Sequence, residues 1–153
     1  MVKTIEQKYK ELSEQEHVIL RPNMYVGSIK PELSTQFVFD YKEQMMVQKE
    51  VEYVPAILKL IDEIISNSTD EYRRPDNIGL TQISVTVMKD NTIVIEDNGG
   101  IPVVKHKEAG IMVPQLIFGR MRTSSNYNDD EDRSGLGTNG VGSSLTNIFS
   151  SYF

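Results

Sequence analysis

The chain has 153 residues, of which 39% are hydrophobic and 25% charged, as in an ordinary globular domain with a core of its own. The formal net charge of −6 argues against direct binding of a DNA backbone, because that needs clustered lysine and arginine to neutralise phosphates. The absence of cysteine excludes disulfides and thiolate metal sites, and with no membrane-length apolar run and no signal-peptide pattern it favours a cytoplasmic protein.

The N-terminal third contains helix-permissive and helix-breaking segments. Residues 4–16 are polar and permit a helix, whereas the proline and glycine of residues 20–28, LRPNMYVGS, end it. Two runs with strand character follow at residues 37–41 and 45–54, and the second partly alternates polar and apolar side chains. We therefore expect helical and then extended structure before residue 55.

A longer helix is predicted over residues 55–71, with Pro55 well placed in its first turn. One stripe of this helix follows helical spacing and is almost entirely apolar. It consists of Ile57, Ile61, Ile64, Ile65 and Ser68.

The roughly opposite face of the same helix stacks Glu63, Asn67 and Asp70 at intervals of four and three residues. Together they offer a carboxylate that can activate water, an amide oxygen that can ligate Mg²⁺ and a second acid. The plain alternative is a solvated helix surface, which the spacing alone favours.

The second half of the chain mixes strands, helices and loops. Residues 83–87 and 92–96 form a predicted hairpin, and residues 113–121 a short helix. An exposed polar loop over residues 123–134 leads into a glycine cluster at 135–142, and a final helix follows at 143–149. Mixed elements that do not strictly alternate predict an α+β fold, with a sheet and helices on one of its sides.

The glycine cluster GLGTNGVG can hold an anion, because small residues just before a helix let backbone N–H groups approach a phosphate. A flexible loop is the alternative. The cluster is not a Walker loop, since no lysine followed by serine or threonine comes after its last glycine. It is not a dinucleotide-binding loop either, since an acidic loop rather than a hydrophobic strand precedes it.

The segment EDNGGIPVV, residues 96–104, places an acid and glycines at the end of a strand. A carboxylate there can accept a hydrogen bond from the exocyclic amine of a base. An ordinary turn is the alternative, because Asp-Asn-Gly commonly makes one.

The order of these motifs resembles the GHKL ATPases, which include gyrase-like topoisomerases, heat-shock chaperones, mismatch-repair ATPases and sensor histidine kinases. Residues 16–28, EHVILRPNMYVGS, resemble the N-terminal signature of the type II DNA topoisomerases, and the other members lack it. Residues 54–70, 114–132 and 139–150 are similar to the eukaryotic and bacteriophage branch. The resemblance spans nearly the whole chain and implies the GHKL (Bergerat) fold, a two-layer sandwich of a mixed β-sheet with helices on one face.

The resemblance also implies a role for individual residues. Glu63 would be the general base that polarises the attacking water, Asn67 would ligate Mg²⁺, and Asp97 would accept from the adenine amine. Tyr25 would reach the nucleotide of a partner subunit. The remaining ATP contacts would come from Ser124, Ser125, Asn126, Gly137, Thr138, Asn139, Gly140, Val141, Gly142, Ser143 and Ser144.

Two positions depart from the family pattern. The usual D-x-G-x-G-I-P is one residue short here, so the adenine contact falls to Asp97 or shifts to Glu96; the downstream spacing favours Asp97. Eukaryotic relatives carry lysine where Ser144 stands, which leaves that phosphate contact to backbone or hydroxyl groups.

The chain is thus expected to be the N-terminal ATPase domain, residues 1–153, of an ATP-dependent type II topoisomerase, without the transducer and DNA-cleavage regions. ATP and Mg²⁺ are its expected ligands, and a second copy, other topoisomerase subunits and, through the full enzyme, DNA its partners. The transducer supplies the γ-phosphate lysine, so the isolated chain should hydrolyse ATP very slowly. The setting would be a bacterial or phage-infected cytoplasm, or a nucleus.

Two alternatives stay open. One is another GHKL ATPase, of the chaperone or mismatch-repair type, although the RPNMYVGS segment argues against it. The other is a split or decoy fragment that binds nucleotide without turnover. A DNA-relaxation assay on the full protein would separate the first from a topoisomerase. Stoichiometric ATP binding without hydrolysis, even when the partner domains are added, would favour the second.

Overall fold

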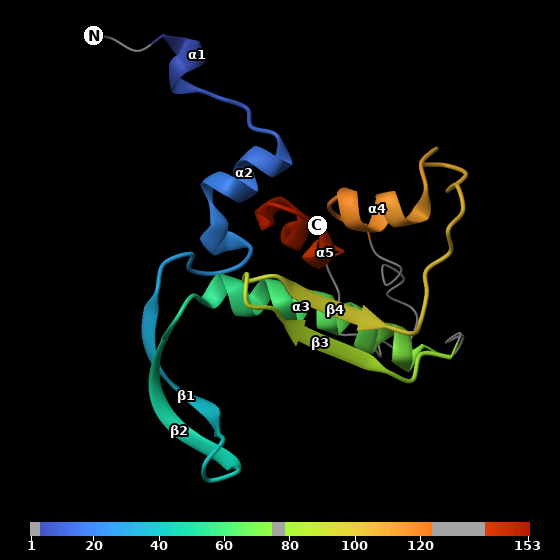
Figure 1. Cartoon of the computed structure of the whole chain (residues 1–153). Coiled ribbons are helices and arrows are strands. Elements are labelled where there is room, and N and C mark those ends of the chain that lie inside the picture. Colours follow the sequence, from blue (N-terminus) through green and yellow to red (C-terminus); the bar gives the residue numbers. More distant parts are fainter. Residues whose placement is uncertain (1–3, 75–78, 124–139) are drawn as a thin grey trace.

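The structure is a computed structural model that describes residues 4–74, 79–123 and 140–153 (Figure 1). It contains both helices and strands, which confirms the α+β class. The elements in chain order are α1 (Ile5–Lys8), α2 (Glu14–Leu20), the 3-10 turn η1 (Pro22–Met24), β1 (Glu32–Asp40), β2 (Met45–Tyr53), α3 (Pro55–Arg73), β3 (Ile83–Val87), β4 (Ile93–Asp97), α4 (Val113–Gly119) and α5 (Gly142–Phe149).

The N-terminal segment forms two short helices rather than one over residues 4–16. The second begins at a capping box, in which the Ser13 hydroxyl accepts from the Glu16 N–H and the Glu16 carboxylate accepts from the Ser13 N–H. The Ser13 hydroxyl also donates to the Glu16 carboxylate at 2.7 Å. This bond first, and the one from the Ser13 N–H second, hold the pKa of Glu16 below its ordinary value. The cap at Ser13 sets the start of α2, which runs to Leu20, and the predicted proline break follows as η1.

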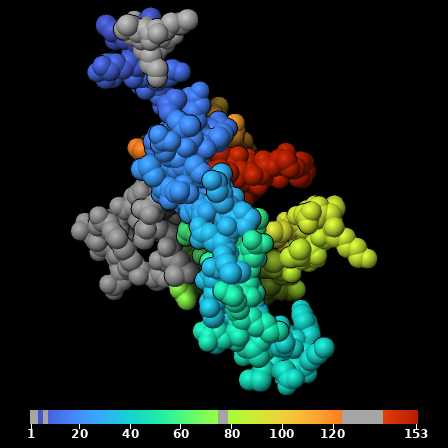
Figure 2. Space-filling view, turned by 90° about the vertical axis from the view of Figure 1, so that its left-hand side faces the viewer, coloured from blue at the N-terminus to red at the C-terminus, as the bar shows by residue number. Residues whose placement is uncertain are grey.

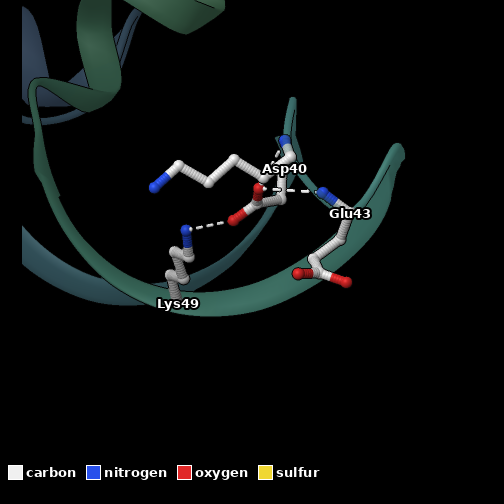
Figure 3. A network of polar contacts seen from close by, with 4 residues as sticks. Asp40, Glu43 and Lys49 are labelled. Atoms are coloured by element: carbon white, nitrogen blue, oxygen red, sulfur yellow. Dashed lines mark hydrogen bonds and ion pairs between the residues drawn. The ribbon is translucent and has the colours of Figure 1, made fainter.

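Strands β1 and β2 form an antiparallel hairpin in which Glu32 pairs with Tyr53 and Asp40 with Met45. Pairing through this register extends β1 to nine residues, whereas the sequence pattern indicated only residues 37–41. The Asp40 carboxylate stabilises the turn, since it accepts from the N–H groups of Lys42 and Glu43 and pairs with Lys49 Nζ at 2.7 Å (Figure 3). The Lys49 hydrogen bond is the main reason why the pKa of Asp40 lies below its ordinary value.

The β1–β2 hairpin extends away from the helices, and Figure 2 shows it projecting from the lower end of the molecule. One of its faces carries large apolar side chains that are open to solvent, including Phe37, which is 68% exposed. The hairpin therefore contributes little to the core.

Helix α3 is the central element, and it forms as the sequence predicts. Pro55 stands in its first turn, and the helix continues to Arg73. The β3–β4 hairpin, with Ile83 opposite Asp97 and Val87 opposite Ile93, agrees with the predicted pair of strands. It lies alongside α3, which its last strand contacts (Figure 1).

The core lies where α2, the start of α3 and α5 meet. Four buried side chains form it, and Leu145 is 1% exposed there. The predicted apolar face of α5 is confirmed, because Ile148 and Phe149 pack against the same cluster. The other buried members are Val18, Val26 and Ala56.

One expectation about the sheet does not hold for the described residues. They contain two separate two-stranded antiparallel sheets, β1–β2 and β3–β4, and no mixed sheet. Each sheet is a hairpin whose two strands are joined by a short turn. Helix α3 connects the two hairpins, and β3, which follows it, does not pair with β1 or β2. In the same parts of the chain no helix is long and apolar enough to span a bilayer.

Candidate functional site

Helix α5 packs against the polar face of α3 and covers part of it, although Asn67 remains exposed. The Glu63 side chain is only 20% exposed, and its carboxylate forms an ion pair of 2.5 Å with Lys59, one turn earlier. This hydrogen bond is the main reason why the pKa of Lys59 lies above its ordinary value. The plain alternative for this face, a solvated helix surface, is therefore wrong for Glu63.

Gly142, the first residue of α5, touches Glu63. A Cβ atom on Gly142 would collide with the Glu63 carboxylate and would lie 3.0 Å from its Cβ. Only glycine fits at position 142, because its backbone lies so close to α3. The lack of a side chain is also what lets the backbone of a phosphate-binding loop approach its ligand. The sequence predicted close approach of this glycine cluster to a phosphate; the contact of Gly142 with Glu63 was not predicted.

Asn67 lies one turn beyond Glu63, and its side chain reaches the first turn of α5. Its Nδ2 donates to Ser143 Oγ at 2.7 Å. The hydroxyl of Thr146 donates to the main-chain oxygen of Leu60 at 3.1 Å and holds α5 against α3 from the other side. Because Nδ2 is used, the Asn67 Oδ1 atom is the part of the amide available to a cation.

The N-terminus of α5 is open to an anion. Among the described residues no side chain caps it, and its N-cap residue is Val141. The first N–H groups of a helix have no acceptor inside it, so they are free to bind a phosphate. Gly140, just before the cap, has a φ of 60°, and its carbonyl accepts from Thr123 N at 2.9 Å. This bond joins Thr123 and Gly140, the described residues on either side of the segment 124–139.

Asp97 ends β4 and faces α3. Its Oδ2 accepts from Ser68 Oγ at 2.6 Å, and its Oδ1 accepts from Gly99 N at 2.9 Å. Glu96, the other acid considered for the adenine contact, is exposed. Because successive side chains of a strand point to opposite faces, only one of these two acids can face α3.

The turn after Asp97 is held by Asn98 and by close packing. Asn98 Oδ1 accepts from the N–H groups of Thr81 and Gln82, each at 2.9 Å. A Cβ on Gly99 would lie 2.7 Å from the Cδ1 of Leu80, which is buried. The main chain at Asp97 is therefore fixed from both sides, as a rigid recognition group requires.

The donor set fits Mg²⁺ and a nucleotide. A magnesium ion keeps several waters and takes one or two protein oxygens together with substrate phosphates, so the single free oxygen of Asn67 is sufficient. No cluster of three or more acids or histidines exists in the described parts of the chain that would form a protein-only metal cage. The open end of α5, next to Asn67 through Ser143, provides the complementary place for a phosphate.

Two other predicted residues have different surroundings. The Tyr25 hydroxyl is bonded to His17 Nδ1 at 2.8 Å, and the ring packs against the core of its own chain. Ser144 is 2% exposed, and its hydroxyl donates to the Arg120 carbonyl at 2.7 Å, which ties α5 to the end of α4. The Ser144 hydroxyl is therefore engaged in packing, and only its N–H remains for a phosphate.

Several predicted ATP contacts lie outside the described residues. They are Ser124, Ser125, Asn126, Gly137, Thr138 and Asn139. Their roles stay predictions, as do those of the exposed polar loop that contains the first three.

Two residues that contact the site were not predicted to do so. Lys59 pairs with Glu63, and their i,i+4 spacing on a helix is a known pairing that could have indicated it. Ser68, at the end of the isoleucine stripe, bonds Asp97. Its polar side chain in an apolar stripe was the available signal.

Comparison with known proteins shows which chains this one is similar to. No family model matches the chain. DNA topoisomerase 2 of Drosophila melanogaster is 41% identical over 150 residues, which are 98% of this chain and 10% of that protein. The Plasmodium falciparum protein of the same name is 44% identical over 157 residues, covering 99% of this chain and 11% of its own length.

Solved structures give the same result. The ATPase region of Saccharomyces cerevisiae topoisomerase II has a TM-score of 0.87 at 38% identity, over 94% of this chain and 38% of that one. The ATPase and transducer domains of DNA topoisomerase II from Balamuthia mandrillaris have a TM-score of 0.90 at 41% identity, over 97% and 38%. The chain thus spans about a tenth of its curated relatives and well under half of the solved chains.

Proposed function

From the premise that this chain is homologous to the ATPase region of the type II DNA topoisomerases, we propose that it binds Mg²⁺ and ATP between α3, the end of β4 and the start of α5. The base would lie at Asp97 and the phosphates at the N-terminus of α5. The assignment is supported by the packing of α3 against both α5 and β4.

Each residue of the site has a distinct part in the proposal. Asn67 would hold Mg²⁺ through Oδ1, and the bound cation supplies charge neutralisation at the phosphates. Glu63 would accept a proton from the attacking water through its carboxylate. Lys59 and Gly142 fix where that carboxylate lies, the first by an ion pair and the second by contact.

The observation that carries the proposal is the contact between Glu63 and Gly142. It brings the water-activating group to the end of the helix that would bind phosphate. A helix N-terminus alone is a common feature, but one with a carboxylate and an amide directly beside it fits phosphate hydrolysis. This juxtaposition joins residues that are about 80 positions apart in the sequence.

Calorimetric titration of the chain with Mg²⁺ and ATP tests the proposal. We expect saturable binding of one ATP per chain, weakened when EDTA removes the metal and weakened by Asn67→Ala. A matched control is Asn147→Ala, because Asn147 lies on α5 but bonds the Phe118 carbonyl away from the site. Absence of binding at millimolar ATP, or equal losses for both variants, would contradict the assignment.

For the whole protein, we propose an ATP-operated gate of a DNA strand-passing enzyme. Binding of ATP by two copies would close the gate on a duplex, and hydrolysis would reopen it. The rest of the parent protein would supply DNA cleavage and the cation at the γ-phosphate. Relaxation of supercoiled DNA by the full protein, lost in Glu63→Gln, is the expected outcome, and chaperone or mismatch-repair activity instead would contradict it.

A further inference from the structure

The polar contact between α3 and the end of β4 involves a serine that no role in the proposed function yet explains. Ser68 is 7% exposed, and its hydroxyl bonds Asp97 Oδ2 at 2.6 Å. It lies at the end of the apolar stripe of α3, where an alanine would fill the same space without a polar group. A buried hydroxyl with one short bond to a carboxylate is therefore a specific feature of this site.

The direction of this hydrogen bond follows from the two groups. An ionised carboxylate has no proton and only accepts, so the Ser68 hydroxyl must be the donor. The single hydroxyl proton is then used, and the oxygen of Ser68 keeps only acceptor capacity. The pair as a whole offers acceptors to any group that approaches it.

The second carboxylate oxygen is fixed independently. Gly99 N donates to Asp97 Oδ1 at 2.9 Å, and the turn that holds Gly99 is fixed by Asn98 and by Leu80. With one donor on each oxygen, the carboxylate plane of Asp97 cannot rotate without breaking a bond. The remaining lone pairs of its oxygens consequently point in fixed directions.

We propose that Ser68 is a positioning residue for base recognition: it orients the Asp97 carboxylate and leaves the pair with acceptors only, so that the site selects a purine with an amino group at position 6. This inference rests on the proposed function, because it assumes that the base lies at Asp97. A base without that donor leaves buried acceptors unpaired, which lowers its affinity.

Competition binding to the 153-residue chain tests the inference with two nucleotides in the presence of Mg²⁺. The first is ATP, and the second is purine riboside triphosphate, which carries hydrogen instead of the amino group at position 6. We expect the wild-type chain to prefer ATP by about 10-fold to 100-fold, as for a hydrogen bond to a charged group. In Ser68→Ala this preference should fall by about tenfold, mostly through weaker ATP binding.

The controls separate orientation from packing. Ser66→Ala makes the same chemical change on α3 at a half-buried serine, and it should leave the preference unchanged. Ser68→Thr retains the hydroxyl and should keep the preference. Ser68→Cys is nearly the same size but has only a weak donor, so it should lower the preference for ATP. It takes the place of Ser68→Ala if the alanine variant does not fold.

The outcomes are distinct. If the wild-type chain binds neither nucleotide, the proposed function fails. If it binds ATP but Ser68→Ala and Ser68→Cys keep the wild-type preference, or weaken both nucleotides equally, Ser68 serves packing alone and the inference is overturned while the proposed function stands. A wild-type chain that binds both nucleotides equally well also overturns it.

Discussion

The two faces of α3 show how far hydrophobic pattern and burial can differ within one helix. The isoleucine face is partly open, since Ile57 is 52% and Leu58 56% exposed. On the opposite face α5 largely covers Glu63, whose side chain is 20% exposed, and bonds Asn67, which stays partly open to solvent. A polar face that is covered by another helix must have partners for its charges and amides, and such partners are what a catalytic site requires.

The partners of the two faces differ in the same way. The isoleucine face borders a hollow of about 410 Å³, lined by Leu58, Ile61 and Ile65 together with the stems of Lys59 and Asp62. The opposite face meets glycine, serine and the open end of a helix. The hollow offers mainly aliphatic surface, and we expect Mg²⁺ and the phosphates on the face with Glu63 and Asn67.

The largest effect is expected at the centre of the covered face. Glu63→Gln keeps the shape but removes the proton acceptor, so hydrolysis by the complete enzyme should fall by roughly 10²-fold or more. ATP binding should remain nearly intact. Steady-state ATPase assays measure the hydrolysis, and calorimetry on the same preparation measures the ATP binding. Unchanged turnover would mean that Glu63 is not the proton acceptor.

Asp97→Asn is expected to weaken ATP affinity by about 1.5–3 kcal/mol, because it removes a charged acceptor and replaces one of the two accepting oxygens with an amide NH₂ group. Glu96→Gln is the matched control, since Glu96 is the adjacent acid but exposed. Calorimetry compares the two variants. A larger loss at Glu96 would show that the adenine contact was assigned to the wrong acid.

Gly142→Ala should disturb the site more than the fold. The new methyl group collides with the Glu63 carboxylate, which must turn away, so hydrolysis by the complete enzyme should fall by about tenfold, as for a displaced catalytic group. Gly119→Ala is the control, because a Cβ there has nothing within 4 Å. Equal activity in the two variants would mean that the Gly142 contact does not position Glu63.

The smallest effect is expected on the open face. Ile57→Ala should lower the free energy of unfolding by less than about 1 kcal/mol, because more than half of the side chain is already in water. Leu145→Ala, in the core, should cost about 2–5 kcal/mol. Denaturant unfolding measures both, and a cost at Ile57 equal to that at Leu145 would mean that this face is covered in solution.

The sequence was sufficient for the elements that depend on local signals. Pro55 and helical spacing predicted α3, and alternation with a turn predicted β3 and β4. Pairing partners were harder, because the extension of β1 back to Glu32 depends on register with β2, which no local pattern contains.

The site divides in the same way. The order of the motifs and their resemblance to the GHKL ATPases indicated Glu63, Asn67 and the glycine cluster, whereas the spacing on the helix alone favoured a solvated surface. The contacts between Asn67 and Ser143, and between Ser68 and Asp97, join residues far apart in the chain, so only the folded structure brings them together. Ser144 was predicted as an ATP contact from its place beside the glycine cluster, and nothing in the sequence indicated that its hydroxyl bonds the Arg120 carbonyl.

The central claim is that the covered, polar face of α3 is the nucleotide site. A titration of the isotope-labelled chain with Mg²⁺ and ATP, followed in ¹H–¹⁵N correlation spectra, tests it directly. The account predicts shifts of the Asn67 side-chain amide and of the Gly99, Gly142 and Ser143 backbone amides, while those of Ile57 and Leu58 stay in place. Shifts confined to the isoleucine face and its hollow, or none at millimolar ATP, would contradict the account.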